Sequence, residues 1–331
     1  MNFTYVGIRE LAAAFQKSRC LLTAYELGVF TALGSKSKTS GEVAKIIKTA
    51  GKSTDRLMNA LCALGLLQKK KGKFSNTPSA LRFLVKCKPE YMASLMHTVN
   101  QWDTWSSLTE AVRRGKPTIA HFFSGSGKEW LAAFIAAMHE RATLQARDTV
   151  SKIDLSRVSQ VLDVGGGSGA FSMAFVRAKK GIRATVFDLP EVVPLTRSYI
   201  RREGLSDKIK TVSGDYNINN LGKGFDLIFL SAVAHSNSFK ENQKLIKKCA
   251  DALNPGGQVV VVDFIMDKER TSPAFGAMFA LNMLVATEQG DTYTESEVRQ
   301  WMRKGGLCAI KRKGTIFGTT LIIGKEAGLG S

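Results

Sequence analysis

The chain has 331 residues, with 47 Lys and Arg against 28 Asp and Glu, which gives a formal net charge of +19 at pH 7. Its 44% hydrophobic and 23% charged residues are ordinary for a globular protein, which excludes a disordered chain, collagen and a coiled coil. The length predicts about two domains. No apolar stretch approaches the roughly 18 residues of a membrane span, and no secretory signal is visible. The five scattered cysteines fit neither a disulfide framework nor a zinc site, so we expect a cytoplasmic protein without a bound metal.

The first hundred residues have the spacing of helices. Leu11–Leu33 keeps apolar residues three and four positions apart and is followed by a glycine, which suits a helix stop. Thr39 and Glu42 form a capping-box pattern at the start of another helix. Ser53–Leu67 is amphipathic, and residues 68–75 suit a short polar hairpin. Two helices and a hairpin in this order are the outline of a winged helix.

Residues 92–115 and 128–150 are again predicted to be helical, and beyond them the pattern changes to strands. Short apolar runs alternate with helical stretches, which implies βαβ units and a parallel sheet covered on both faces. These runs are Val161–Val164, Thr185–Phe187, Ile209–Val212, Leu227–Leu230 and Val259–Val262, with a possible terminal hairpin at Ala309–Arg312 and Thr319–Ile323.

The most informative motif is Val161–Gly169, in which a buried strand leads into a glycine-rich turn and then an apolar helix. Asp188 ends the next strand, where a carboxylate in a doubly wound sheet can accept hydrogen bonds from ribose hydroxyls. Two cofactor classes use this geometry. A dinucleotide fingerprint can be placed on Gly165, Gly167 and Ala170, but a single match of this kind is a weak signal.

The second class is S-adenosylmethionine (SAM), whose [DE]-x-G-x-G-x-G loop fits Asp163, Gly165, Gly167 and Gly169 without adjustment. Asp163 can hold the ammonium group of SAM, directly or through water, whereas it would repel a pyrophosphate. Asp215 follows a third strand, where a carboxylate can accept from an adenine amino group. The turn Asn254–Gly257 is typical of the fifth strand in such enzymes. Jointly these features favour SAM over NAD, although singly Asp163 could cap a helix and Asp188 could be a turn residue.

In this combination the chain resembles the SAM-dependent O-methyltransferases of the caffeate and hydroxyindole type, including their bacterial relatives, over nearly its whole length. Ala24–Phe30 and Leu61–Leu67 resemble the winged-helix dimerisation domain of that family. Trp102–Pro117 and Phe134–His139 resemble the helices that line the substrate pocket of that family. The remaining matches lie in the C-terminal half, at Val161–Gly169, Phe187–Pro190, Ser213–Asp215 and Ala280–Leu284.

The resemblance implies an α/β fold, with a Rossmann-like seven-stranded SAM methyltransferase domain at 151–326. A mostly helical winged-helix dimerisation domain at 1–100 and a helical linker with substrate-pocket helices at 101–150 would precede it. The implied activity is methyl transfer from SAM to a hydroxyl of a small aromatic acceptor, with S-adenosylhomocysteine (SAH) as product, no metal, and a homodimer as the assembly.

The resemblance also implies site residues. The residues expected to bind the cofactor are Asp163, Gly165, Gly167, Gly169, Asp188, Leu189, Asp215, Tyr216 and Ser231. The residues expected to line the acceptor pocket are Phe134, Met138, Met278, Asn282 and Met283. Core packing is the alternative reading of these Met and Phe side chains.

A candidate general base comes from position in the sheet. A phenol, with a pKa of about 10, is rarely ionised at neutral pH, and a general base is typically worth about 10²–10⁴ in rate. Of the four histidines only His235 lies just past the fourth strand, at the sheet edge where doubly wound folds bind ligands. It matches the family's catalytic histidine by position. Asp263 ends the fifth strand and matches an acidic residue that would orient the imidazole. Alternatively His235 only caps the turn and Asp263 faces solvent.

Two departures from the family pattern leave the accepting atom open. The family usually continues His-Asp-Trp, whereas Ser236 and Asn237 follow here. A second acidic partner falls on Thr292, with Asp291 one place off. The histidine could therefore be less well oriented, or the acceptor could be an amine, a thiol or an activated carbon.

Two other classes of function remain. The high charge, with a pI near 9.8, and the Lys69–Lys71 cluster would suit a winged-helix nucleic-acid-binding protein with a SAM-binding domain. However, Ser53–Leu67 offers few side chains for base readout, and Ser231–Ala234 stands where amino-methylating nucleic-acid enzymes carry a (D/N/S)-P-P-(Y/F) box. We therefore expect no nucleic-acid partner. The third class is a regulator that keeps the SAM pocket without the chemistry.

Overall fold

The computed structural model describes residues 4–118 and 127–326. The chain divides into two compact units, Met1–Trp102 and Asp103–Ser331. The predicted helical linker at 101–150 falls almost wholly in the second unit, and its residues 119–126 lie outside the described part.

The first unit is a small helical body with one hairpin. Its elements are α1 (Tyr5–Ala13), α2 (Phe15–Glu26), α3 (Val29–Leu33), α4 (Ser40–Ile47), α5 (Gly51–Ala63), β1 (Leu67–Lys70), β2 (Lys73–Asn76), α6 (Pro78–Phe83) and α7 (Leu95–Asn100). The capping box of Thr39 and Glu42 at the start of α4 is present, and β1 and β2 form the predicted hairpin. The single helix predicted over Leu11–Leu33 is wrong, because the chain breaks around Ala14 and again at Gly28, which takes a left-handed φ of 79°.

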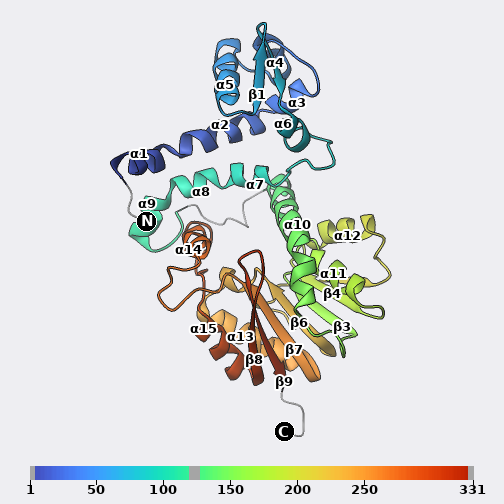
Figure 1. Cartoon of the computed structure of the whole chain (residues 1–331). Coiled ribbons are helices and arrows are strands. Elements are labelled where there is room, and N and C mark those ends of the chain that lie inside the picture. The colour runs from blue at the N-terminus through green and yellow to red at the C-terminus, as the bar shows by residue number, and fades with distance from the viewer. Residues whose placement is uncertain (1–3, 119–126, 327–331) are drawn as a thin grey trace. The chain divides into compact units, whose positions relative to one another are not determined.

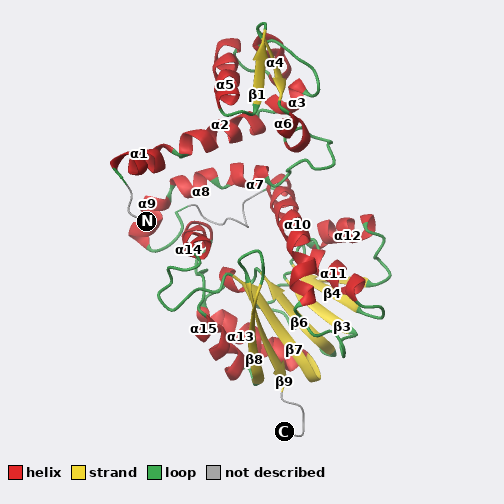
Figure 2. Ribbon diagram, viewed as in Figure 1, coloured by secondary structure: helices red, strands yellow, loops and turns green. Residues whose placement is uncertain are grey.

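The second unit contains helices on either side of one sheet (Figures 1 and 2). Its helices are α9 (Leu108–Arg114), α10 (Lys128–Ser151), α11 (Ala170–Ala178), α12 (Val193–Arg202), α13 (Phe239–Ala252), α14 (Ala274–Ala286) and α15 (Glu295–Lys304), with α8 (Trp102–Ser106) at the junction and a short 3-10 helix, η1 (Ala234–Ser236). Its strands are β3 (Gln160–Val164), β4 (Arg183–Asp188), β5 (Ile209–Ser213), β6 (Phe225–Ser231), β7 (Leu253–Asp263), β8 (Leu307–Gly314) and β9 (Thr320–Glu326).

The sheet has seven strands in the order β5-β4-β3-β6-β7-β9-β8. The first five in this order are parallel, and β9 runs antiparallel between β7 and β8. The prediction of a seven-stranded α/β domain is therefore confirmed. The chain moves from β3 outward through β4 and β5, then returns to place β6 on the other side of β3. Ligands of open α/β sheets bind at such a switch point, beyond the carboxyl ends of the strands.

Alternation along the strands builds a core on each face of the sheet. Val161, Val186 and Phe229 pack on the face that carries α10, α11 and α12. Leu162 and Val164 pack on the face that carries α13 and α15. Because side chains of a strand alternate between faces, the apolar runs read from the sequence belong to strands buried on both sides.

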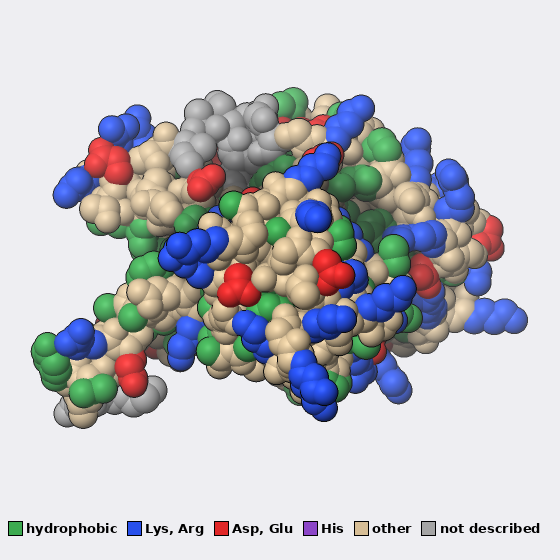
Figure 3. Space-filling model, turned by 90° about the horizontal axis from the view of Figure 1, so that it is seen from above, with side chains coloured by type: hydrophobic (Ala, Val, Ile, Leu, Met, Phe, Trp, Pro, Cys, Tyr) green, Lys and Arg blue, Asp and Glu red, His purple; other side chains and the backbone are tan. Residues whose placement is uncertain are grey.

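Basic side chains occur over much of the face that Figure 3 shows. Figure 3 shows Lys and Arg side chains scattered over the face in view, with Asp and Glu among them.

Candidate active site

The glycine loop between β3 and α11 brings the backbone close to its neighbours. Gly165 has a φ of 64°, and a Cβ built on it would lie 2.8 Å from the side chain of Val233. At Gly166 a Cβ would lie 2.8 Å from the carboxyl carbon of Asp163. A side chain at either position would force its neighbours apart, so the loop can pack this closely only with glycine at both positions.

Asp188 joins this loop to the end of β4. Its Oδ2 accepts a hydrogen bond of 2.7 Å from the amide of Gly167, and its Oδ1 accepts one of 2.8 Å from the amide of Leu189. The amide of Gly214 donates to the carbonyl of Asp188, which ties in the end of β5. Burial raises the pKa of the Asp188 carboxyl above its ordinary value although the two amides oppose the shift. The ends of three adjacent strands are thus joined through Asp188, β3 and β4 by its carboxylate and β5 by its backbone carbonyl.

Asp163 lies under the loop. Its side chain is 1% exposed, and Oδ2 accepts a hydrogen bond of 2.8 Å from the hydroxyl of Ser172 on α11. Burial raises the pKa of this carboxyl to about 7, and the nearby charge of Asp188 adds to the shift. The carboxylate therefore braces the loop and the first turn of α11 from inside.

The loop after β5 carries Asp215 and Tyr216, both half-buried. Oδ1 of Asp215 accepts a 2.7 Å hydrogen bond from the amide of Asn217. The ammonium group of Lys248 donates to the carbonyls of Tyr216 and Asn217 at 2.9 and 3.0 Å. The ring of Tyr216 reaches the glycine loop, because one of its carbons lies 3.8 Å from the Cβ position of Gly165.

Asn237 connects this loop to the turn after β6. It is buried, and its Oδ1 accepts a hydrogen bond from the Tyr216 hydroxyl at 3.4 Å. Its amide nitrogen donates to Asn242 at 3.2 Å, and Asn242 donates to the carbonyl of Ala234 at 2.8 Å. The departure from the family pattern at this position therefore has a structural use that the sequence did not reveal. The signal was a polar residue directly after a candidate catalytic turn.

His235 and Asp263 form a buried pair at the ends of β6 and β7. Nδ1 of His235 lies 2.9 Å from Oδ1 and 3.1 Å from Oδ2 of Asp263, and the backbone amide of His235 also donates to Oδ2 at 3.2 Å. The alternative that Asp263 faces solvent is wrong, because its side chain is 6% exposed. Burial alone would raise the pKa of Asp263, but attraction to His235 and hydrogen bonds from His235 and the amide of Phe264 together hold that pKa below its ordinary value.

The local backbone sets this geometry. Ser231, half-buried, ends β6, and Ala232 after it has a left-handed φ of 57°. The short helix η1 then begins and carries His235 back against β7. Left-handed backbone at a residue with a side chain costs roughly 1–2 kcal/mol, and such strain is often found at functional sites.

The segment that was expected to supply a second acidic partner contacts the backbone of His235 instead. The amide of Asp291 donates to the carbonyl of His235 at 3.0 Å, while its carboxylate pairs with Arg270 at 3.4 Å. Thr292 is buried, and its carbonyl accepts from Arg270. Among the described residues, Asp263 is therefore the one carboxylate hydrogen-bonded to this imidazole.

Comparison with known proteins identifies the family of the chain. The model of the O-methyltransferase domain matches residues 105–307, more than half of the chain, and that of the O-methyltransferase dimerisation domain matches residues 9–86. The chain belongs to the O-methyltransferase family. The predicted family, enzyme class and SAM cofactor are confirmed: this is a SAM-dependent O-methyltransferase.

Individual relatives match this methyltransferase over nearly its whole length. It is 31% identical to 3-hydroxy-5-methyl-1-naphthoate 3-O-methyltransferase of Streptomyces sahachiroi, over 92% of this chain and 90% of the relative. It is 30% identical to the tetracenomycin polyketide synthesis 8-O-methyl transferase of Streptomyces glaucescens, over 96% of each. A solved structure described as PigF with SAH shares the fold, with a TM-score of 0.90 at 23% identity, covering 98% of this chain and all of that one.

The predicted acceptor residues of this O-methyltransferase lie on α10 and α14. Phe134 and Met138 are half-buried on α10, and Met278 is 53% exposed on α14. Oδ1 of Asn282 accepts a hydrogen bond from the indole of Trp105 at 2.9 Å, which ties α14 to α8. Met283 is buried at 6% exposure, so of the five it is the one most enclosed by packing.

Aromatic rings link α14 to the buried pair. The ring of Phe279 meets that of His235 edge to face, with centroids 4.8 Å apart. Phe279 also packs on Phe264 at 4.9 Å and on Phe275 at 6.1 Å. Sequence reasoning named none of these three phenylalanines; the helical spacing of Phe275 and Phe279 with Asn282 was the available signal.

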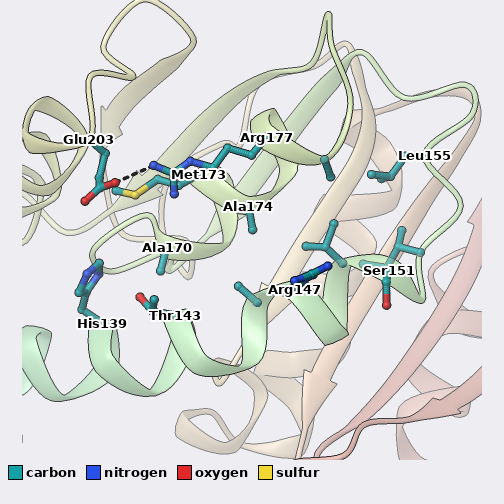
Figure 4. A pocket seen from close by; sticks show the side chains of 14 residues that line it. His139, Thr143, Arg147, Ser151, Leu155, Ala170, Met173, Ala174, Arg177 and Glu203 are labelled. Carbon is teal, nitrogen blue, oxygen red and sulfur yellow. Dashed lines mark hydrogen bonds and ion pairs between the residues drawn. The ribbon is translucent and has the colours of Figure 1, made fainter. Parts of the chain in front are cut away.

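A cavity of about 680 Å³ lies between α10 and α11 (Figure 4). His139, Thr143 and Arg147 of α10 line it opposite Met173 and Arg177 of α11. None of the residues predicted to bind SAM or to act as base lines this cavity. It is therefore a different place from the site at the strand ends.

Two negative observations concern the described residues alone. They include no group of three or more His, Cys, Asp and Glu side chains that could hold a metal ion. None of the helices among them is long and apolar enough to cross a membrane.

Proposed function

We propose that this O-methyltransferase methylates a hydroxyl group of a small aromatic acceptor, with His235 as the general base and Asp263 as the residue that orients it. The observation that carries the proposal is the hydrogen bond between Nδ1 of His235 and the buried carboxylate of Asp263, at the carboxyl edge of the sheet. The printed names of the two Streptomyces relatives, which describe O-methylation of a hydroxynaphthoate and of a polyketide, support an aromatic acceptor.

The carboxylate decides which nitrogen is the base. Because Asp263 accepts only, Nδ1 of a neutral His235 carries the hydrogen, and the lone pair is left on Nε2. Nε2 takes the proton from the acceptor hydroxyl, and the negative charge of Asp263 stabilises the imidazolium that results. Such a base typically contributes about 10²–10⁴ in rate.

The residues at the strand ends fit SAM, whose electrophilic methyl group is the chemistry that the cofactor supplies when bound. At Gly167 a Cβ would meet nothing nearer than a side-chain carbon of Ile135 at 3.9 Å, which leaves room for a ligand against the backbone, and the Asp188 carboxylate lies beside it as an acceptor for hydroxyl groups. We assign to this site Asp163, Gly165, Gly167, Gly169, Asp188, Leu189, Asp215, Tyr216 and Ser231. Of these, Asp163 supports the glycine loop from the protein interior, because its carboxylate is buried and hydrogen-bonded to Ser172.

Phe134, Met138, Met278, Asn282 and Met283 are proposed to line the acceptor side. Met278 and Phe275, one turn apart on α14, both expose apolar surface, and such a surface suits an aromatic ligand.

The experiment is a methyl-transfer assay with isotopically labelled SAM against a panel of hydroxynaphthoates, simple phenols, aromatic amines and thiols. We expect label in a phenolic methyl ether, and a loss of at least about 100-fold in kcat for His235→Gln with SAH binding retained. Label found only in amines or thiols would contradict O-methylation by this chain. Full activity of His235→Gln on a phenol would remove the general-base role.

A homodimer through the first unit completes the proposal. Residues 9–86 match a dimerisation domain, and α1 exposes Tyr5, Val6, Ile8 and Leu11 by 58–75% of their surfaces. Light scattering should give twice the mass of the chain. The double variant Ile8→Glu with Leu11→Glu should give monomers, whereas Glu10→Gln, a change on the same helix, should not. A wild-type monomer at high protein concentration would contradict the homodimer.

A further inference from the structure

Arg141 lies on the same face of α10 as two residues proposed to line the acceptor side. It follows Met138 by three positions and Phe134 by seven, the spacing of neighbours on one helix face. Its guanidinium carbon is 4.7 Å from the ring centroid of Phe264 and 5.9 Å from that of Phe275. Phe264 directly follows Asp263, so Arg141 places a positive charge close to the His235–Asp263 pair.

No anion neutralises this charge in the described parts of the chain. Arg141 is half-buried, and neither a hydrogen bond nor an ion pair joins it to a described residue. Burial lowers the pKa of its guanidinium below the ordinary value, while the charge of Asp263 opposes that shift. Both oxygens of Asp263 already accept from His235, and Oδ1 also accepts from the amide of Phe264. The carboxylate that attracts Arg141 is thus committed to the imidazole.

A half-buried guanidinium with its donors unused is costly unless a ligand supplies the acceptors. The guanidinium makes cation–π contacts with the rings of Phe264 and Phe275. Its N–H donors lie in the guanidinium plane and point outward from its edge, where these contacts do not use them. A planar anion is the partner that matches this edge, because two parallel N–H···O bonds form between a guanidinium and a carboxylate.

We propose that Arg141 is a specificity-determining residue that binds a carboxylate on the aromatic acceptor. This inference rests on the proposed function and names the substrate class of the same site: hydroxyaromatic acids, whose ring packs near Phe275 and Phe279 while the hydroxyl meets His235.

The test compares hydroxynaphthoates that differ in the position of the carboxylate, each paired with its uncharged carboxamide. Wild-type protein should methylate at least one acid with a kcat/KM about 10- to 100-fold above that of its carboxamide, the worth of a hydrogen bond to a charged group. Arg141→Met should lose this preference, through a higher KM for the acid, while its kcat/KM for the carboxamide stays within about threefold. Arg141→Lys should retain part of the preference, and Arg147→Met, an exposed change on the same helix, all of it.

Binding separates this inference from the proposed function. Calorimetry on the SAH-loaded protein measures the dissociation constants of the same pairs without chemistry. Tighter binding of the acids that depends on Arg141, without methylation, would support the carboxylate site and overturn the proposed reaction. Methylation with equal kcat/KM for acid and carboxamide, or an equal loss on both in Arg141→Met, would overturn the inference and leave the function standing. Neither binding nor methylation across the panel would count against both.

Discussion

Nδ1 of His235 lies 2.9 Å from Oδ1 of Asp263, although the two residues are 28 positions apart in the chain. The distance follows from the sheet, because β6 and β7 are parallel neighbours whose carboxyl ends meet at one edge. The imidazole is held a second time through its own backbone, whose amide donates to Oδ2 of the same carboxylate. Both the ring and the turn that carries it are thus fixed by one residue.

Asp263→Asn tests what this carboxylate contributes. An asparagine can donate from its amide nitrogen, which favours the wrong tautomer of His235 and removes the charge that stabilises the imidazolium. We expect kcat to fall by about 10²–10⁴ at neutral pH with little change in the KM for SAM. Steady-state kinetics measure both parameters. A loss confined to KM would show that Asp263 positions a ligand and not the base.

The pair could be predicted from the sequence because strand ends are readable. Apolar runs located β6 and β7, and in parallel strands the residues that follow such runs share an edge. Asp188 was found in the same way. The phenylalanines around His235 were not found, because their meeting depends on how α14 lies on the sheet. Arg141 was missed for the same reason: it contacts Phe264 and Phe275, which are more than a hundred positions away, and no local pattern encodes that contact.

Local signals also misled in one place. The apolar spacing of Leu11–Leu33 is continuous, yet the helix is interrupted around Ala14 and ends again before Gly28, which adopts a left-handed conformation. A glycine inside a periodic pattern can be tolerated or can end the helix, and the periodicity alone does not say which.

Asn237 is expected to matter for cofactor affinity although it lies beside the base. Its side chain joins the hydroxyl of Tyr216 to Asn242, and both hydrogen bonds are inside the protein. Asn237→Ala leaves these groups unpaired, which costs about 1–3 kcal/mol of unfolding free energy. Because the ring of Tyr216 lies against the glycine loop, we also expect the KM for SAM to rise several-fold. Urea denaturation and kinetics at varied SAM measure the two effects. Asn220→Ala, an exposed change in the loop after Tyr216, is the control, and equal effects of the two variants would contradict the role.

Gly165→Ala tests the close packing of the glycine loop. The new methyl group would lie against Val233 and require a left-handed backbone, so we expect a loss of about 2–4 kcal/mol in unfolding free energy. SAH binding measured by calorimetry should weaken at least tenfold, since relief of the contact with Val233 would displace the glycine loop that we assign to the cofactor. Gly181→Ala is the matched control: its φ is 94° and nothing lies within 4 Å of its Cβ position. Gly181→Ala should lose only the unfolding free energy that the left-handed backbone costs, about 1–2 kcal/mol, and should bind SAH as the wild type does. Equal losses in the two variants would show that the Val233 contact is unimportant.

Asp163 should make stability depend on pH in the direction opposite to an ordinary paired carboxylate. Its pKa is about 7 in the folded chain against an ordinary 3.8. Between these values the folded state holds a proton that the unfolded state has released, so the unfolding free energy falls as pH rises from about 4 to about 7 and is level above. The Asp163→Asn variant has no titrating group at this position. As pH rises across this window, the unfolding free energy of the variant should therefore increase relative to that of the wild type, by up to about 4 kcal/mol. Urea denaturation of both proteins at pH 5, 6, 7 and 8 measures the difference. Asp207→Asn, an exposed change, should track the wild type at every pH. A constant difference between wild type and Asp163→Asn would mean that the Asp163 carboxyl is ionised throughout, with Ser172 and the loop amides outweighing its burial.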